Sequence, residues 1–283
     1  MNRLVERKRE LPSDILLRDS SAQAARDHWN AHPCGDVDAE EGTPQYFHDV
    51  SNHRYSLHPW LGERIDELAI PGGRVLEIGH GIGTDLVRFA QHGMKVSAVD
   101  LSKRHHNLAT RNLARIGATG DLHICDASRL PFPSASMDLV YSFGVMHHMK
   151  NPFPCVDECR RVLKPGGKIV VGLYYRYSAF HIVTKILLHG VLFGGFFRLG
   201  YRGVLATVEE GAGGLKDKPF VHCYSKREMR GLLSDFTSVE TEVTHFRKNH
   251  LGIRRIYERF PDSWLPAFDK RFGWYVIGTG IKT

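Results

Sequence analysis

The sequence predicts an α/β fold, a doubly wound and mostly parallel sheet of seven strands. Strand-like and helix-like segments alternate from Arg74 onward, and a glycine turn, VLEIGHGIGTD at residues 75–85, follows the first strand. Acidic residues also follow the ends of successive strands. Because open parallel sheets bind ligands at the carboxyl ends of their strands, the same pattern predicts a ligand site at that edge.

The strands and helices follow in a regular order. The expected strands cover residues 74–78, 95–100, 122–126, 137–143, 168–175, 239–246 and 271–281. The connecting helices cover residues 84–92, 102–116, about 152–164 and 225–235. The first three of these helices end at glycine or proline, which do not continue a helix, and the last begins with the capping box Ser-Lys-Arg-Glu.

Two segments lie outside this alternation. Residues 178–223 form an apolar insertion after the fifth strand, longer than an ordinary connection. Its helix is apolar nearly all round, so we expect a buried or substrate-covering cap. Residues 1–70 contain two helices, over 21–33 and 53–68, and are too small for a core of their own. They predict an N-terminal helical lid on a Rossmann-like domain of residues 71–283.

Composition indicates a cytoplasmic globular protein. The 283 residues are 42% hydrophobic, enough for one large core. The five cysteines are odd in number and lack C-x-x-C spacing, so we expect neither a disulfide framework nor a metal site. The charged N-terminus does not resemble a signal peptide. The most apolar window, residues 182–197, is too short to span a bilayer and contains Lys185 and His189.

The net charge of +7 permits an anionic partner without requiring one. Basic residues are scattered except in two runs, over 3–10 and 246–255. We interpret both runs as solvated faces, because no RNA-binding signature accompanies them, and we expect no nucleic-acid partner. The sequence does not indicate an oligomeric state.

The glycine turn predicts a nucleotide-like ligand lying against bare backbone. Its spacing, Gly79-x-Gly81-x-Gly83, differs from the G-x-G-x-x-G of dinucleotide-binding proteins. Glu77 beside the turn would repel a pyrophosphate and suits a ligand with a cationic amine, which favours S-adenosylmethionine. Asp100 ends the second strand, where a carboxylate can accept both ribose hydroxyls; capping the next helix is the alternative role.

Residues 74–175 resemble the catalytic core of class I S-adenosylmethionine-dependent methyltransferases, particularly the branch that includes the ubiquinone and menaquinone biosynthesis enzymes. The resemblance rests on VLEIGHGIGTD, VDLS, DASRLPFPSASMDLVYSFGVMHHM and RVLKPGG, which occur in this order. It implies S-adenosylmethionine as the methyl donor and S-adenosylhomocysteine as the product. It does not identify the acceptor.

The resemblance also implies roles for individual residues. The turn glycines would lie under the methionine part of the cofactor, and Asp100 would hold the ribose with Leu101 against the adenine. Asp126 would meet the adenine amino group and Ala127 the ring edge. His80 departs from the small residue or cysteine often found at its position, and packing or solvent exposure is its alternative role. The expected cofactor-binding set is Glu77, Gly79, His80, Gly81, Gly83, Asp100, Leu101, Asp126, Ala127, Ser142 and His147.

Ser142 and His147, near the end of the fourth strand, would border the methyl group. A sulfonium methyl is already activated, so the protein must mainly align the nucleophile and exclude water. We expect His148, with His147 as second choice, to take or orient a proton of the acceptor; a place on the polar rim of the site is the alternative for both residues. Tyr175 is a further catalytic candidate from a run of tyrosines, for which simple aromatic packing is the alternative.

The apolar insertion predicts a small or medium-sized, largely apolar acceptor, enclosed between the lid and the insertion. A peptide or RNA acceptor and a non-catalytic binding protein are the alternatives. The segment SFGVMHHM at residues 142–149 contains neither the N-P-P-Y motif nor the paired cysteines that RNA enzymes use. The sequence therefore favours a metabolite without identifying the acceptor atom.

Overall fold

Seven strands form one sheet in the order β3-β2-β1-β4-β5-β7-β6. The computed structural model describes residues 20–33, 37–209 and 218–283. The strands are β1 (Arg74–Ile78), β2 (Lys95–Asp100), β3 (Asp121–Ile124), β4 (Met137–Phe143), β5 (Leu163–Tyr174), β6 (Thr237–Thr244) and β7 (Tyr275–Ile281). Strands β1 to β5 are parallel, and β7 runs antiparallel to both β5 and β6. The predicted doubly wound sheet is therefore confirmed.

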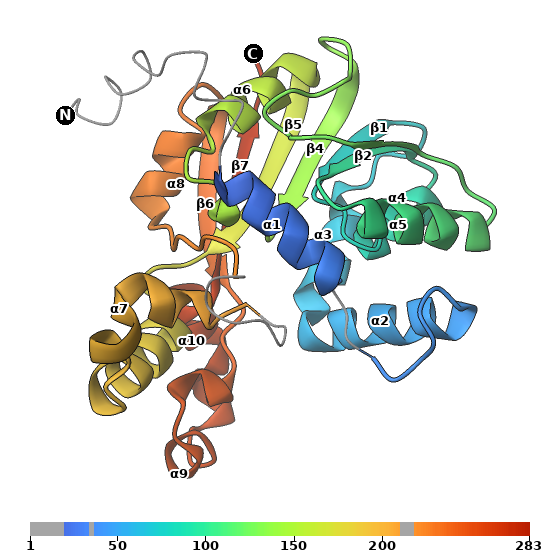
Figure 1. Cartoon of the computed structure of the whole chain (residues 1–283). Coiled ribbons are helices and arrows are strands. Elements are labelled where there is room, and N and C mark those ends of the chain that lie inside the picture. Colours follow the sequence, from blue (N-terminus) through green and yellow to red (C-terminus); the bar gives the residue numbers. More distant parts are fainter. Residues whose placement is uncertain (1–19, 34–36, 210–217) are drawn as a thin grey trace.

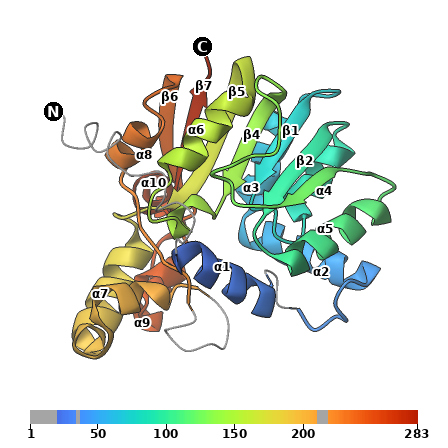
Figure 2. The same ribbon diagram turned by 45° about the horizontal axis from the view of Figure 1, so that its top comes forward.

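Helices cover both faces of the sheet (Figures 1 and 2). The helices that flank the sheet are α3 (Pro59–Leu68), α4 (Thr84–Gln91), α5 (Lys103–Arg115), α6 (Phe153–Val162) and α8 (Lys226–Leu232). The others are α1 (Ser20–Ala31), α2 (Pro44–Leu57), η3 (Met146–His148), η4 (Phe180–Leu192), α7 (Gly195–Ala206), η6 (Lys248–Leu251), α9 (Arg254–Tyr257), η7 (Asp262–Trp264) and α10 (Leu265–Phe272). The elements between β6 and β7 were not predicted, and they delay the start of the last strand to Tyr275.

The single helix expected over residues 53–68 is wrong. Two helices occupy this region, α2 and α3, and the chain leaves the helical conformation at His58 with φ −128° and ψ 65°. Proline disfavours helical geometry in the residue before it, so Pro59 separates the two helices. Helix α2 also begins earlier than expected, at Pro44, where the Thr43 hydroxyl accepts a hydrogen bond from the Tyr46 N–H at 3.2 Å.

Helix η4 of the insertion after β5 is only partly buried, so of the two expectations, a buried or a substrate-covering cap, full burial is not met and the substrate-covering role stays a prediction. Helix η4 has π-helical hydrogen bonding, and its inward residues His181, Lys185 and Gly190 recur at spacings of four and five. Its polar side chains have interior partners: the Thr184 hydroxyl donates to the His250 carbonyl at 2.9 Å, and the Lys185 ammonium binds Thr207. Several apolar side chains of the insertion are exposed instead: Leu187, Val191, Leu192, Phe193, Phe197, Leu199 and Tyr201.

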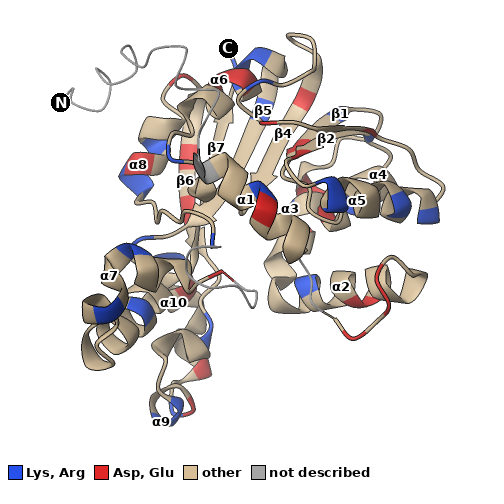
Figure 3. Cartoon of the chain, in the orientation of Figure 1, with Lys and Arg blue, Asp and Glu red and all other residues tan. Residues whose placement is uncertain are grey.

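Charged side chains are spread over the molecule rather than gathered on one face (Figure 3). Arg254 and Arg255, from the basic run at residues 246–255, are exposed as expected. The other run, over residues 3–10, lies outside the described residues. Among the described helices, none has the length and apolar character needed to cross a bilayer.

An ion pair with a buried carboxylate holds α2 on the sheet domain, because Asp85 is 2% exposed and its partner Arg54 is 29% exposed. The Arg54 guanidinium of α2 binds both carboxylate oxygens of Asp85 in α4, at 2.7 and 2.5 Å. The Tyr55 and Tyr141 hydroxyls donate to the same carboxylate at 3.0 Å each. Burial alone would raise the pKa of Asp85, but Arg54 and these hydrogen bonds hold it below its usual value. Asp85 is therefore charged inside the protein and depends on its partners.

We expect Arg54→Met to lower the free energy of unfolding by about 3 kcal/mol, because it leaves the Asp85 charge buried without its cation. The matched control is Arg64→Met in α3, which removes an ion pair with Glu242 whose side chains are 30% and 47% exposed. An exposed pair contributes less than about 1 kcal/mol. Urea unfolding of both variants measures the difference, and equal losses would contradict the assigned role of Arg54.

Candidate functional site

The glycine turn between β1 and α4 has the backbone conformation that the sequence predicts. Gly79, Gly81 and Gly83 have φ values of 71°, 52° and 77°, in the left-handed region that favours glycine. A Cβ on Gly79 would lie 2.3 Å from a methyl group of Val145, and one on Gly83 would lie 3.0 Å from the Ala109 Cβ. The turn therefore needs glycine for both conformation and close packing.

Asp100, at the end of β2, holds this turn in place. Its Oδ2 accepts the Gly81 N–H at 3.0 Å and its Oδ1 accepts the Ser102 N–H at 2.8 Å. The Ser102 hydroxyl caps α5 by accepting the His105 N–H, so Asp100 is not needed as the helix cap. Burial alone would raise the pKa of Asp100, but the His105 hydrogen bond and charge, among other contacts, keep it low. An ionised carboxylate thus lies beside the turn.

Two other titratable side chains of the turn are buried. Glu77 is 4% exposed, and its Oε2 has no hydrogen-bond partner among the described residues. Burial raises the pKa of Glu77 well above its usual value, and the nearby Asp85 charge raises it further. His80 is also 4% exposed and its Nδ1 lies 2.7 Å from the Gly81 carbonyl oxygen, so the structure places it inside rather than in solvent.

The remaining expected cofactor residues lie along the same edge of the sheet. Asp126 is exposed and accepts the Ser128 N–H at 2.8 Å, while Ala127 is buried in the core. Leu101 is half-buried directly after β2. Ser142 is fully buried in β4, with its hydroxyl 3.5 Å from the Ile78 carbonyl oxygen. The strand ends therefore bring together the residues that the sequence predicts, although their cofactor contacts stay predictions.

Helix α1 links the Asp100 side of the site to the histidine pair after β4. The Trp29 ring centre lies 6.1 Å from that of His105 and 5.9 Å from that of His148. The Ser102 hydroxyl donates to the Asn30 side chain at 2.9 Å. Helix α1 thus packs across this edge of the sheet (Figure 2).

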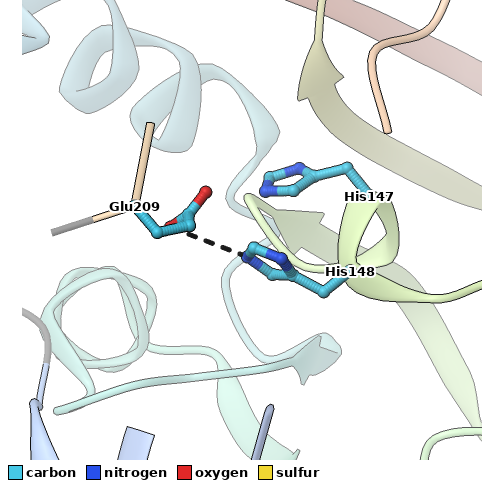
Figure 4. Close-up of side chains that lie close together, drawn as sticks. All are labelled: His147, His148 and Glu209. Carbon is cyan, nitrogen blue, oxygen red and sulfur yellow. Dashed lines mark ion pairs between the residues drawn. The ribbon is translucent and has the colours of Figure 1, made fainter. Parts of the chain in front are cut away.

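The histidine pair itself lies in η3, after β4. His147 is fully buried and His148 is 8% exposed, and Glu209 from the end of the insertion lies beside them (Figure 4). The His148 Nε2 is 3.9 Å from a Glu209 carboxylate oxygen. Sequence reasoning missed Glu209, because a single glutamate 61 positions beyond His148 carries no local motif.

Tyr174, rather than Tyr175, contacts the histidine pair. The Tyr174 ring stacks on His147 with ring centres 3.8 Å apart, and Trp274 stacks on Tyr174 at 4.3 Å. Successive residues of a strand point to opposite faces, so Tyr175 packs instead in the hydrophobic core on the other side of β5, near Tyr224. Within the part of the chain that the structure describes, Tyr175 makes no ring contact with His147 or His148, and its catalytic role stays a prediction.

A second histidine cluster lies where β6 and β7 meet α3. His58 and His245 stack with ring centres 4.4 Å apart, and His250 is 5.6 Å from His245. The His245 Nδ1 accepts the Trp60 indole N–H at 3.4 Å, and the His250 Nδ1 accepts the Arg247 backbone N–H at 3.2 Å. Burial, together with nearby positive groups, lowers the pKa of His245 to about 2 and that of His250 to about 3.

Comparison with known proteins identifies the domain. Residues 76–171 match the sequence model of a family described as "Methyltransferase domain". The chain is 35% identical over 137 residues to demethylmenaquinone methyltransferase of Renibacterium salmoninarum, a match that covers 47% of this chain and 55% of the relative. It is 30% identical over 118 residues to a sterol 4-C-methyltransferase of Caenorhabditis elegans, covering 41% of this chain and 35% of the relative. The chain therefore spans about half of these relatives' length or less.

Solved structures give the same fold. Geranyl diphosphate C-methyltransferase from Streptomyces coelicolor, solved with Mg²⁺, geranyl diphosphate and S-adenosyl-L-homocysteine, has a TM-score of 0.58 at 14% identity. The similarity covers 93% of this chain and 98% of that enzyme. Residues 76–171 thus resemble a methyltransferase domain, the chain shares the fold of that enzyme, and the expected resemblance to S-adenosylmethionine-dependent methyltransferases is confirmed.

We expect the second histidine cluster to make stability fall as pH drops below about 6.5. The unfolded chain takes up protons there while His245 and His250 stay neutral in the folded protein, so the unfolded state binds more protons. Each histidine contributes a slope of about 1.4 kcal/mol per pH unit.

Urea unfolding between about pH 6.5 and about pH 5 measures how the free energy of unfolding changes with pH. The His250→Phe variant should show a slope smaller by the contribution of one histidine, about 1.4 kcal/mol per pH unit. The control is His53→Leu, at an exposed position in α2. A His250→Phe slope equal to that of the control would contradict the assignment.

Proposed function

We propose that this chain transfers a methyl group from S-adenosylmethionine to a small or medium-sized, largely apolar metabolite. The donor binds across the turn from Glu77 to Gly83, and Asp100 accepts hydrogen bonds from its ribose hydroxyls. The acceptor approaches from the side of the histidine pair. Methyl transfer then proceeds by in-line displacement, in which the acceptor's electron pair attacks the methyl carbon and S-adenosylhomocysteine leaves.

The observation that supports this most strongly is the turn together with Asp100. Three left-handed glycines leave no side chain in the way of a ligand, and an ionised carboxylate lies beside them. The buried Oε2 of Glu77 has no hydrogen-bond partner among the described residues, which suits the cationic amine of the donor's methionine part. These features match a ligand that has a ribose and an ammonium group.

The acceptor class is supported by two other observations. The Tyr174 ring stacks on His147 and the Trp274 ring stacks on Tyr174, so these rings give the methyl-acceptor side an apolar wall. The similar proteins named above are methyltransferases of demethylmenaquinone, a sterol and geranyl diphosphate. The insertion reaches the histidine pair through Glu209, and its exposed apolar side chains are available to cover an apolar acceptor.

The histidine pair takes the role of orienting the acceptor. Both histidines belong to η3, and Val145, directly before η3, packs against Gly79 of the glycine turn. We keep His148 as the first candidate and His147 as the second. A histidine that removes a proton would contribute about 10²–10⁴ in rate. A carboxylate acceptor would need no such base.

Asp100→Ala should weaken binding of S-adenosylhomocysteine by about 1.5–3 kcal/mol, through loss of a charged hydrogen-bond acceptor. Isothermal titration calorimetry measures the affinity. The matched control is Asp121→Ala, which removes an exposed carboxylate at the start of β3. Asp100→Asn keeps an oxygen that can accept the Gly81 N–H, so it separates loss of ribose binding from loss of the turn. Wild-type affinity in folded Asp100→Ala would exclude the ribose role.

We also expect α1 to act as a lid that the cofactor orders. Trp29 contacts both His105, which binds Asp100, and His148, so a bound cofactor should restrict the helix from both sides. Hydrogen exchange of residues 20–31 should slow on adding S-adenosylhomocysteine, while exchange in α10 stays unchanged. Unchanged exchange in α1 at saturating ligand would identify it as a static brace.

A further inference from the structure

His147, His148 and Glu209 form a compact cluster of potential metal ligands, which we call the His-His-Glu cluster. Each residue offers one ligand atom, and these atoms lie within 4.8 Å of one another. The three side chains point toward one another from η3 and from the end of the insertion (Figure 4). Residue exposures of 0, 8 and 6% place the cluster out of bulk solvent.

The hydrogen-bonding of the cluster is incomplete. Both ring nitrogens of His147 and the Oε1 of Glu209 are buried without a hydrogen-bond partner among the described residues. Buried polar atoms are normally paired, because leaving them unpaired is costly. A neutral imidazole has one nitrogen lone pair that can bind a metal ion, and no described residue occupies either ring nitrogen of His147.

His148 is oriented as metal-binding histidines usually are. Its Nδ1 lies 2.8 Å from the Phe220 carbonyl oxygen, which can only accept, so Nδ1 carries the hydrogen. In the neutral ring, the Nε2 lone pair then faces the Glu209 carboxylate at 3.9 Å. In this arrangement the Nε2 lone pair and the Glu209 carboxylate repel each other, and a cation bound between them replaces the repulsion with two attractive contacts. A backbone carbonyl on the outer nitrogen is the usual second contact of a histidine ligand.

The carboxylate ligand has outer contacts as well. Burial raises the pKa of Tyr174 well above its usual value, and the charge of Glu209 and a hydrogen bond to it add to the shift. Two ammonium groups lie near Glu209. That of Lys185 binds Thr207 through the backbone oxygen at 3.0 Å and the hydroxyl at 2.9 Å, and that of Lys218 donates to the Glu209 backbone carbonyl. None of these contacts satisfies the Oε1 of Glu209.

We propose that the His-His-Glu cluster binds one divalent transition-metal ion of the zinc type. Two imidazole nitrogens and one carboxylate oxygen suit Zn²⁺, whereas Mg²⁺ and Ca²⁺ prefer oxygen ligands. Three protein ligands leave a fourth position of a tetrahedral site open for water or an oxygen of a small molecule. The ion would also join the end of the insertion to η3.

This site stands on its own geometry and does not require the proposed methyl transfer. If both hold, the ion deepens that function: it selects acceptors with an oxygen that can coordinate beside Trp29, and His148 acts as a ligand rather than as a base. A metal-binding measurement therefore tests the site even if the chain transfers no methyl group.

The test uses the full chain, stripped with a chelator and titrated with Zn²⁺ in a calorimeter. We expect one equivalent to bind to the wild type, and Co²⁺ to give the visible absorption of a tetrahedral site. Glu209→Gln and His147→Asn should each weaken Zn²⁺ binding by more than about 100-fold, since loss of an outer-shell partner alone costs about 10–100-fold. The control is His222→Asn, because the His222 ring contacts Arg176 outside the cluster.

Thermal melting and far-ultraviolet circular dichroism establish whether each variant is folded, and His148→Asn replaces any variant that is not. Equal Zn²⁺ binding by the cluster variants and by His222→Asn would overturn the proposal, because it would indicate adventitious surface binding. Absence of Zn²⁺ binding to the wild type would overturn it as well. Intact S-adenosylhomocysteine binding in that case would leave the proposed function untouched.

Discussion

The site depends on one hydrogen bond, from the Gly81 N–H to the Asp100 carboxylate. It connects the turn after β1 to the end of β2, while the Gly79 N–H donates to the Val99 carbonyl and the Gly83 N–H to the His80 carbonyl within the same left-handed backbone. Because Asp100 also accepts from Ser102 and contacts His105, the same carboxylate orients the start of α5. A ligand that binds over the turn therefore meets a surface already arranged for it.

The two sides of this edge are built differently. On the N-terminal side, the ion pair of Arg54 with the buried Asp85 carboxylate holds α2 in place. Helix α1 reaches the site through Trp29 and Asn30. On the acceptor side, polar groups with missing partners gather around His147 and Glu209. Helix α1 therefore suits a cover that can move. The surroundings of His147 and Glu209 suit a site that a ligand or an ion completes.

The strands of the sheet and the residues at their ends could be predicted because they follow local periodicity and spacing. The break at His58 was predictable in principle from Pro59, but the continuous apolar pattern obscured it. The orientation of η4 was not predictable from an α-helical wheel, since π-helical spacing moves Lys185 inward and Leu187 outward. Glu209 and Tyr174 were missed as partners of the histidines, because tertiary folding alone brings them together.

The central claim is methyl transfer from S-adenosylmethionine to a small apolar metabolite. The most direct measurement incubates the purified chain with methyl-labelled S-adenosylmethionine and a cell extract separated into organic-soluble metabolites, protein and RNA. The account predicts label in the organic-soluble fraction, and loss of that label when the Asp100→Ala variant replaces the wild type. Label confined to protein or RNA, or no transfer by a chain that binds S-adenosylhomocysteine in the presence of every fraction, would contradict it.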